Sequence, residues 1–336
     1  MKAIGFAQPL PIDQPGALQD IELPAPQPGP RDLLVRVQAV SVNPVDTKVR
    51  RNAKPAPGQF RVLGWDAVGT VEATGAQVRN FQPGDRVYYA GSILRPGTNS
   101  ELHAVDERIV ALAPKSLSDT QAAALPLTSI TAYELLFDRL GVAHGGGAGQ
   151  TLLVVGGAGG VGSILIQLAR QLTQLRIVAT ASRAETRQWC LDLGAHLVVD
   201  HRFPLAAALR EEGIASVDMV ASLTQTEQHY EQLIEALMPQ GKLAVIDDMP
   251  VLNAMPLKSK CISLHWEIMF ARSSYETPDM HRQGELLAEV AQLVDAGRVR
   301  TTLGEQFGRI DAANLTRAHA FIESGKAQGK VVLEGF

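Results

Sequence analysis

A glycine-rich turn between an apolar strand and an apolar helix constrains the fold of this chain more than any other feature. The segment 152–162 reads LLVVGGAGGVG, and Gly157, Gly159 and Gly162 have the spacing GxGxxG. In such a turn the first glycine permits a tight bend, the second lets the backbone approach a pyrophosphate, and the third lets the helix pack on the strand. The segment therefore predicts a dinucleotide-binding loop made of Gly157, Ala158, Gly159, Gly160, Val161 and Gly162. A glycine-rich turn without a ligand is the alternative.

The chain around this turn alternates between short apolar strands and helices. This alternation is typical of a parallel, doubly wound sheet with crossover helices. Helices are predicted over 161–172 and 185–193. Strands are predicted over 151–155, 176–181, 197–200, 217–221, 242–246 and 261–265.

The segments on either side of this α/β region have a different pattern. Residues 1–125 are β-rich and interrupted by proline and glycine, which indicates a compact antiparallel or barrel-like domain. A helical stretch over 118–137 is broken at Pro126, and helices over 281–296 and 315–323 precede a last strand at 331–333. This tail is too short for a domain of its own. We therefore expect an α/β protein with one domain from 1–125 and 272–336 and a second from 126–271.

Charge and composition exclude several classes of partner. The formal net charge of −4 is spread without a basic block, which argues against nucleic acid and against an anionic membrane surface. The N-terminus lacks the apolar core of a signal peptide, and no apolar run approaches the ~20 residues that span a bilayer. We expect a cytoplasmic location, with Cys190 and Cys261 as two buried, unpaired thiols.

The end of the second predicted strand indicates which dinucleotide is bound. NAD-preferring loops place an Asp or Glu there to bind the ribose 2′-OH, but this chain has Ser182 and Arg183. A hydroxyl and a guanidinium suit a 2′-phosphate, so we predict NADP(H), with Arg187 as a further contact. The alternatives are that Ser182 caps the next helix in a capping box with Glu185, and that Arg183 is an ordinary surface residue.

Several ordered motifs across the chain resemble the medium-chain dehydrogenase/reductase superfamily. The resemblance is greatest to its zinc-type alcohol dehydrogenase-like and quinone oxidoreductase (zeta-crystallin-like) branch, and it implies a GroES-like β-barrel catalytic domain interrupted by a Rossmann domain. Besides the glycine loop, the motifs are Asn43-Pro44-Val45-Asp46, Gly64-Trp65-Asp66-Ala67-Val68-Gly69-Thr70-Val71, Pro83-Gly84-Asp85-Arg86-Val87, Ala124-Leu125-Pro126-Leu127-Thr128 with Thr131-Ala132-Tyr133, and Gly329-Lys330-Val331-Val332-Leu333.

The chain departs from the zinc-dependent members of this superfamily wherever they bind metal. Those members hold catalytic zinc with a Cys, a His-Glu pair and a second Cys, and structural zinc with four close cysteines. Residues 88–105 contain no cysteine. The corresponding catalytic segments read Ser41-Val42-Asn43-Pro44, Gly64-Trp65-Asp66 and Pro126-Leu127-Thr128, and Asp46, Asp66 and His103 do not have a recognised zinc spacing. We therefore predict no metal.

Without a Lewis acid, reduction of a conjugated acceptor is easier than oxidation of an alcohol. We predict hydride transfer from NADPH to a quinone or an α,β-unsaturated carbonyl. The candidate catalytic residues are Asn43, Asp46, Tyr89 and, by resemblance, Thr131. The first three have structural alternatives: a turn for Asn43, a helix cap for Asp46 and barrel packing for Tyr89. Further candidate cofactor contacts are Leu223, Thr224, Ile246, Trp266, Met269, Phe270 and Lys330, with core packing as the alternative for the aromatic and methionine residues.

Two other functions remain open at this point. One is a zinc-dependent alcohol dehydrogenase with an unusual metal site, and the other is a non-catalytic NADPH-binding sensor or structural protein. The resemblance also implies a homodimer formed through the edge of the parallel sheet near 258–265.

Overall fold

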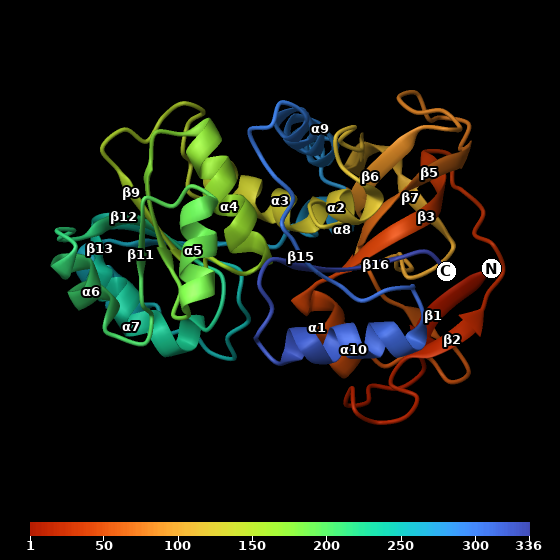
Figure 1. Ribbon diagram of the computed structural model, residues 1–336, viewed down its shortest axis with the longest axis horizontal. Coiled ribbons are helices and arrows are strands. Elements are labelled where there is room, and N and C mark those ends of the chain that lie inside the picture. The colour runs from red at the N-terminus through yellow and green to blue at the C-terminus, as the bar shows by residue number, and fades with distance from the viewer. The chain divides into compact units, whose positions relative to one another are not determined.

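The computed structural model describes all 336 residues and divides into two compact units (Figure 1). Unit 1 comprises Met1–Ile130 and Phe270–Phe336, and unit 2 comprises Thr131–Met269. The chain passes from the first unit into the second within helix α3 (Pro126–Tyr133).

Unit 2 is built on one six-stranded parallel sheet. Its strands follow the spatial order β11-β10-β9-β12-β13-β14, so the first strand of the unit lies beside both the second and the fourth. This is the strand order of dinucleotide-binding sheets, with the order reversing between β9 and β12. The strands are β9 (Thr151–Val155), β10 (Arg176–Thr180), β11 (Leu197–Val199), β12 (Val217–Ser222), β13 (Leu237–Val245) and β14 (Ser263–Trp266).

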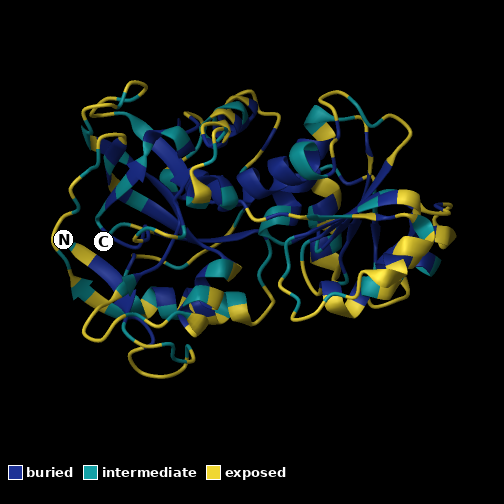
Figure 2. Ribbon diagram, turned by 180° about the vertical axis from the view of Figure 1, so that it is seen from behind, coloured by how far each residue is buried: buried dark blue, intermediate teal, exposed yellow.

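Helices cover this sheet and bury its apolar strands (Figure 2). They are α4 (Gly160–Leu172), α5 (Ala184–Asp192), α6 (Leu205–Glu211), α7 (Thr226–Ala236), the π-helix η2 (Glu134–Arg139) and the 3₁₀-helix η3 (Met255–Lys260). The predicted doubly wound sheet is therefore confirmed. Strand β13 begins five residues earlier than predicted, and its first part, which contains Pro239 and a left-handed Gln240, pairs irregularly with β12.

Unit 1 contains a larger, mainly antiparallel sheet. Its spatial order is β15-β16-β3-β5-β6-β8, and β7 also pairs with β3. A separate small sheet has the order β2-β1-β4. The strands are β1 (Lys2–Phe6), β2 (Gln19–Glu22), β3 (Asp32–Val42), β4 (Arg61–Val62), β5 (Asp66–Thr74), β6 (Arg86–Ala90), β7 (Leu102–Asp106), β8 (Val110–Leu112), β15 (Leu303–Gln306) and β16 (Lys330–Glu334).

The C-terminal tail completes this sheet, since β16 pairs antiparallel with β3. The helices of unit 1 are α1 (Pro44–Asn52), the 3₁₀-helix η1 (Glu107–Ile109), α2 (Asp119–Ala123), α8 (Ala271–Tyr275), α9 (Arg282–Asp295) and α10 (Ala312–Glu323). Helices α1 and α10 lie side by side (Figure 1).

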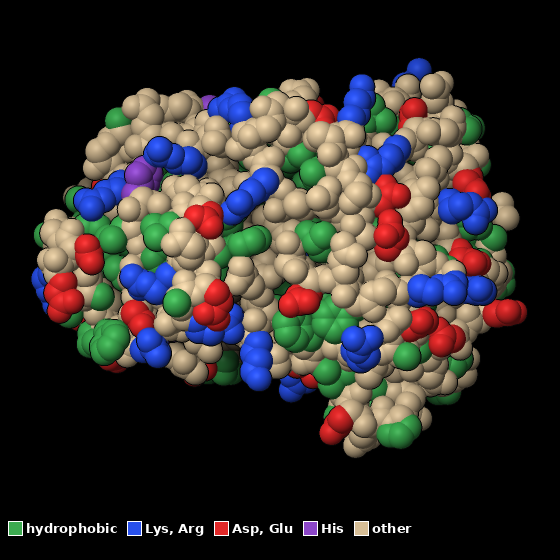
Figure 3. Space-filling view, viewed as in Figure 1, with side chains coloured by type: hydrophobic (Ala, Val, Ile, Leu, Met, Phe, Trp, Pro, Cys, Tyr) green, Lys and Arg blue, Asp and Glu red, His purple; other side chains and the backbone are tan.

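Two features of the surface bear on the sequence predictions. Cys190 is buried, but Cys261 is exposed and precedes β14, so the expectation of two buried thiols was wrong for Cys261. No helix is long and apolar enough to cross a membrane. Positive and negative side chains are interspersed over the face drawn in Figure 3.

Candidate active site

The glycine turn, defined as Gly156–Gly162, joins β9 to α4 at the carboxyl edge of the parallel sheet. Its left-handed residue is Gly156, with φ of 80°, whereas Gly157 has an ordinary φ. A Cβ on Gly157 would lie 2.8 Å from Ala179 Cβ, so close packing requires glycine there. The tight bend that the sequence assigned to Gly157 therefore belongs to Gly156.

The other two glycines of the motif differ in what surrounds them. A Cβ on Gly162 would lie 2.4 Å from the carbonyl oxygen of Gly156, so any side chain there would push the helix off the strand. A Cβ on Gly159 would meet only that same oxygen, at 3.4 Å. Packing within the protein therefore explains glycine at 157 and 162, but it does not explain glycine at 159.

The first turn of α4 presents unpaired donors. The helix begins at Gly160, and its first internal backbone bond runs from Ser163 N to Gly159 O (2.9 Å). The backbone N–H groups of Gly160, Val161 and Gly162 have no partner within the protein. Three successive free N–H groups at a helix N-terminus, with the positive end of the helix dipole, form an anion-binding site.

The neighbouring strand ends converge on the glycine turn. Gly156 N donates to Thr180 Oγ1 (3.0 Å) at the end of β10. Leu223 N donates to Val155 O (3.3 Å), and a Cβ on Gly156 would lie 2.9 Å from Thr224 Cγ2. Ile246, at the end of β13, is joined through its N–H to Ser222 O (3.3 Å). The predicted Leu223, Thr224 and Ile246 thus line the same edge as the glycine turn.

The loop after β10 carries the predicted phosphate contacts. Arg183, not Ser182, is the N-cap residue of α5, and its backbone N–H donates to Thr186 Oγ1 (3.3 Å). The predicted capping box of Ser182 with Glu185 was therefore wrong. Instead, Glu185 forms an ion pair with Arg183 at 3.0 Å. Arg187 lies one turn into the helix and is half-buried.

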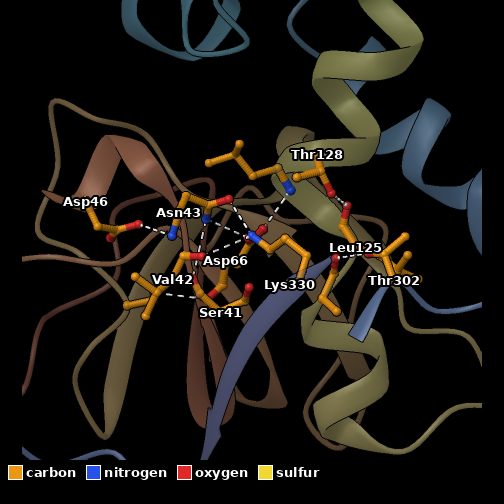
Figure 4. Close-up of polar contacts among 12 residues, drawn as sticks. Ser41, Val42, Asn43, Asp46, Asp66, Leu125, Thr128, Thr302 and Lys330 are labelled. Carbon is orange, nitrogen blue, oxygen red and sulfur yellow. Dashed lines mark hydrogen bonds and ion pairs between the residues drawn. The ribbon is translucent and has the colours of Figure 1, made fainter. Parts of the chain in front are cut away.

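A buried polar cluster in unit 1 contains the predicted Asn43 and Lys330 (Figure 4). The Asp66 carboxylate accepts from Asn43 Nδ2 (2.8 Å), Lys330 Nζ (2.9 Å) and the backbone N–H of Leu127 (2.6 Å). Lys330 also donates to Asn43 Oδ1 and to Val42 O (3.4 Å). All three protons of the lysine ammonium are therefore directed at protein acceptors, and the predicted cofactor contact of Lys330 gains no support from this geometry.

The Asn43 amide makes its hydrogen bonds within the same cluster. Its Nδ2 group donates to Asp66 and, at 3.4 Å, to Ser41 O. The side chain is 1% exposed. Neither amide hydrogen is left for a substrate oxygen, so this arrangement does not support the catalytic role predicted for Asn43.

Asp46 has the role of a helix cap. Its Oδ2 accepts from the backbone N–H of Asn43 (2.7 Å) at the start of α1. Burial raises the pKa of the Asp46 carboxyl to about 7. Of the two predicted roles, the structure favours capping.

Tyr89 is withdrawn as a catalytic candidate. Its side chain is fully buried, and its hydroxyl lies 3.0 Å from His103 Nδ1. His103 Nε2 must donate to the carbonyl oxygen of Pro96 (3.0 Å), so Nδ1 accepts from the tyrosine. Burial lowers the pKa of His103 to about 4, which keeps the ring neutral. The Tyr89 hydroxyl therefore donates its hydrogen bond to His103 inside the barrel.

The remaining candidates have different surroundings. Thr131 is buried in α3, and Met269 is buried after β14. Phe270 packs edge-on against Trp65 with ring centroids 5.5 Å apart, which is the core-packing alternative. Trp266 is 51% exposed at the end of β14, so it is not a core residue.

The residues at the positions of the zinc ligands do not fit a metal. No group of three or more His, Cys, Asp or Glu side chains is arranged to hold an ion. Trp65 donates its indole N–H to Ser92 O (3.2 Å), Thr128 donates to Leu125 O (3.1 Å), and the Asp66 oxygens are filled by protein donors. Zinc prefers thiolate, imidazole and carboxylate ligands, and the one carboxylate in this set already accepts from an amide, an ammonium and a backbone N–H.

Sequence reasoning missed two groups of polar residues. Asp66 was considered only as a substitute metal ligand, although an acid in a run of apolar strand residues is a signal for a buried partner. Glu134 and Glu267 in unit 2 are both fully buried around Arg139, and Glu267 accepts from Arg139 Nε at 2.7 Å. Nothing in their sequence spacing indicates that they meet.

Comparisons with known proteins agree with this architecture. Residues 29–115 match the alcohol dehydrogenase GroES-like domain, and residues 193–333 match the zinc-binding dehydrogenase model. A zinc-type alcohol dehydrogenase-like protein of Staphylococcus aureus is 40% identical over 339 residues, covering 99% of each chain.

Two solved structures have the same fold throughout. A Rhizobium etli protein described as a zinc-dependent alcohol dehydrogenase is 52% identical with a TM-score of 0.95, covering 100% of this chain and 98% of the other. The Escherichia coli quinone oxidoreductase in complex with NADPH is 26% identical with a TM-score of 0.85, covering 99% and 100%. The chain therefore belongs to the medium-chain dehydrogenase/reductase superfamily of oxidoreductases, in its quinone oxidoreductase-like branch.

Proposed function

We propose that this protein is a metal-independent, NADPH-dependent reductase of quinones or α,β-unsaturated carbonyls. The observation that carries the proposal is the first turn of α4, where three free backbone N–H groups lie beside a glycine that packing does not require. The E. coli quinone oxidoreductase, which shares the fold, is described in complex with NADPH.

The residues present fit a dinucleotide. The N–H groups of Gly160, Val161 and Gly162 would hold the pyrophosphate, and open space at Gly159 would admit it. Ser182, Arg183 and Arg187 would bind the 2′-phosphate, since no acid ends β10 and the guanidinium fork matches a phosphate. When bound, NADPH supplies the hydride.

The reaction class follows from what the chain offers to the acceptor. A metal would polarise an alcohol or a simple carbonyl, but the candidate zinc positions are occupied by Trp65, Thr128 and an Asp66 that is paired with Lys330. A conjugated acceptor is already electrophilic at carbon, so it needs less assistance. The protein then has to orient the two reactants and exclude water.

A second candidate function is favoured by one set of observations. The S. aureus and R. etli relatives carry the names of zinc-type or zinc-dependent alcohol dehydrogenases. In that case the purified protein would contain one zinc per chain, and activity would be lost together with the metal. The donor set described above supports the metal-independent alternative.

Two properties of the whole protein accompany this proposal. Strand β14 is an edge strand followed by Ile268, which is 61% exposed, and we propose that a homodimer forms along this edge. The two free cysteines support a reducing, cytoplasmic compartment. Light scattering of the purified chain measures the first property.

The direct experiment measures oxidation of NADPH with panels of quinones, enones, aldehydes and alcohols, with and without a chelator. We expect turnover of at least one quinone or enone that the chelator does not change. Turnover of alcohols alone, abolished by the chelator, would favour the zinc enzyme. NADPH binding without turnover of any acceptor would indicate a non-catalytic role.

A further inference from the structure

Asp66 lies at a junction of four structural elements of unit 1. It begins β5, and its carboxylate binds Asn43 before α1, Leu127 in the first turn of α3 and Lys330 at the start of β16 (Figure 4). The residue is fully buried, and Lys330 is 3% exposed. One carboxylate therefore connects segments that are far apart in the sequence.

The chemistry of the two charged residues fixes the orientation of the Asn43 amide. A carboxylate only accepts hydrogen bonds and an ammonium only donates them. Nδ2 must therefore face Asp66, and Oδ1 must face Lys330. Turning the amide over would place donor against donor and acceptor against acceptor. The ion pair thus fixes which end of the Asn43 amide faces each charged neighbour.

The same carboxylate anchors the beginning of α3. Pro126 is the first residue of this helix and has no N–H, so Leu127 N is the first donor that needs a partner, and Asp66 Oδ1 accepts from it at 2.6 Å. A negative charge at this end also complements the helix dipole. Thr131 lies one helical turn beyond Leu127, on the same face.

Stability alone does not account for such a pair. Transferring two charges out of water costs several kcal/mol per ion, and well-packed apolar residues of similar volume often serve equally well or better. A buried ion pair does confer a unique geometry on the groups that it binds. The relevant groups here are the Asn43 amide and the first turn of α3.

We propose that Asp66, held by Lys330, is a positioning residue for the proposed reductase reaction: it sets the Asn43 amide and the register of α3, and thereby the place of Thr131. This inference rests on the proposed function. It assigns the Asp66–Lys330 pair no contact with the cofactor or the acceptor. We expect the Asp66–Lys330 pair to affect kcat and not the affinity for NADPH, because the glycine turn that would hold the dinucleotide belongs to unit 2.

The test uses the neutral double variant Asp66→Asn/Lys330→Met, which removes both charges with little change of volume. We expect its affinity for NADPH to stay within about twofold, and its kcat to fall on the order of 100-fold, the effect of a misplacement of about 1 Å. Asp66→Glu retains the charge and moves the anchor by one methylene group. We expect it to lower kcat as well, and it provides the test if the double variant does not fold.

The matched control is Asp32→Asn/Arg95→Met. It removes another partly buried ion pair of unit 1, with Arg95 NH2 and Asp32 Oδ2 2.7 Å apart, whose side chains make no hydrogen bond to Asn43, Asp66, Thr131 or Lys330. We expect it to lower the melting temperature but to leave kcat within about twofold. Circular dichroism and thermal unfolding establish that each variant is folded.

The outcomes separate the two proposals. A folded double variant or a folded Asp66→Glu protein with wild-type kcat overturns the positioning role while the reductase proposal stands. Equal losses of kcat in the control pair would also overturn it, because stability would then be the cause. A wild-type protein that turns over no acceptor overturns both proposals.

Discussion

Glu267 forms an ion pair of 2.7 Å with Arg139, the last residue of the π-helix of unit 2, and Glu134, the first residue of that helix, is also buried. Burial, and then the charge of Glu134, raises the pKa of Glu267 to about 8. His265 and Lys242 lie on the neighbouring strands, and burial, Lys242 and Arg139 lower the pKa of His265. Arg139 thus supplies one positive charge to two buried acids, and burial together with the charge of Glu134 favours the protonated form of Glu267.

This pair predicts a pH dependence of stability. A carboxyl whose pKa is raised by folding binds an extra proton in the folded state between its ordinary value of 4.5 and about 8. The free energy of unfolding should therefore fall as the pH rises through this window. Glu134→Gln should flatten that fall, and urea unfolding at several pH values measures it. Glu285→Gln, at a mostly exposed acid, should leave the slope unchanged; an equal change in both variants would exclude the buried pair as the cause.

The two glycines of the turn should respond differently to alanine. Gly162→Ala places a Cβ 2.4 Å from a carbonyl oxygen and should destabilise the fold by about 1–3 kcal/mol. Gly159→Ala meets only one atom, at 3.4 Å, and should leave the melting temperature within about 2 °C. It should nevertheless abolish most NADPH binding, because the methyl group occupies the path of the pyrophosphate. Unimpaired binding by the folded Gly159→Ala protein would contradict this role of the turn.

Arg183 should distinguish the two nicotinamide cofactors. Arg183→Glu should weaken NADPH binding by roughly 1.5–3 kcal/mol, or about 10- to 150-fold, and NADH binding far less. The exposed ion pair with Glu185 offsets little of this, since such pairs contribute under about 1 kcal/mol. Calorimetry measures both affinities. The control is Arg210→Glu, another exposed arginine of unit 2 that is paired with an acid on α7.

Tyr89→Phe should separate a structural hydroxyl from a catalytic one. The variant leaves His103 Nδ1 without its donor in a fully buried place and should cost about 1–3 kcal/mol of stability. Because the hydroxyl donates its hydrogen bond to His103 inside the barrel, kcat should not change. A large loss of kcat in the folded variant would restore Tyr89 as a catalytic candidate.

Much of unit 2 was predictable because its signals are local. A buried strand, a glycine turn and an apolar helix follow one another between Thr151 and Leu172, and the prediction there was wrong by at most one residue. Strands such as β1 and β7 are short and take their stability from partners distant in the sequence. Helix α1 has few apolar residues, so its pattern gave no helical signal.

The candidate site was less predictable because its polar residues depend on hydrogen-bond partners that are distant in the sequence. The sequence identified Asn43 and Lys330 separately, but not that Asp66 would satisfy both. It also placed Tyr89 in the site, since no local pattern shows that His103 Nδ1 would accept a hydrogen bond from its hydroxyl. A buried polar group is defined by the hydrogen bonds it makes, and here these join residues 14 to 287 positions apart.

The central claim is that the turn after β9 binds the pyrophosphate of NADPH, and calorimetric titration of the metal-depleted protein tests it most directly. The account predicts binding of one NADPH per chain, at least about tenfold tighter than NADH, from the phosphate contribution given above. No binding of either nucleotide, or equal affinities for both, would contradict it.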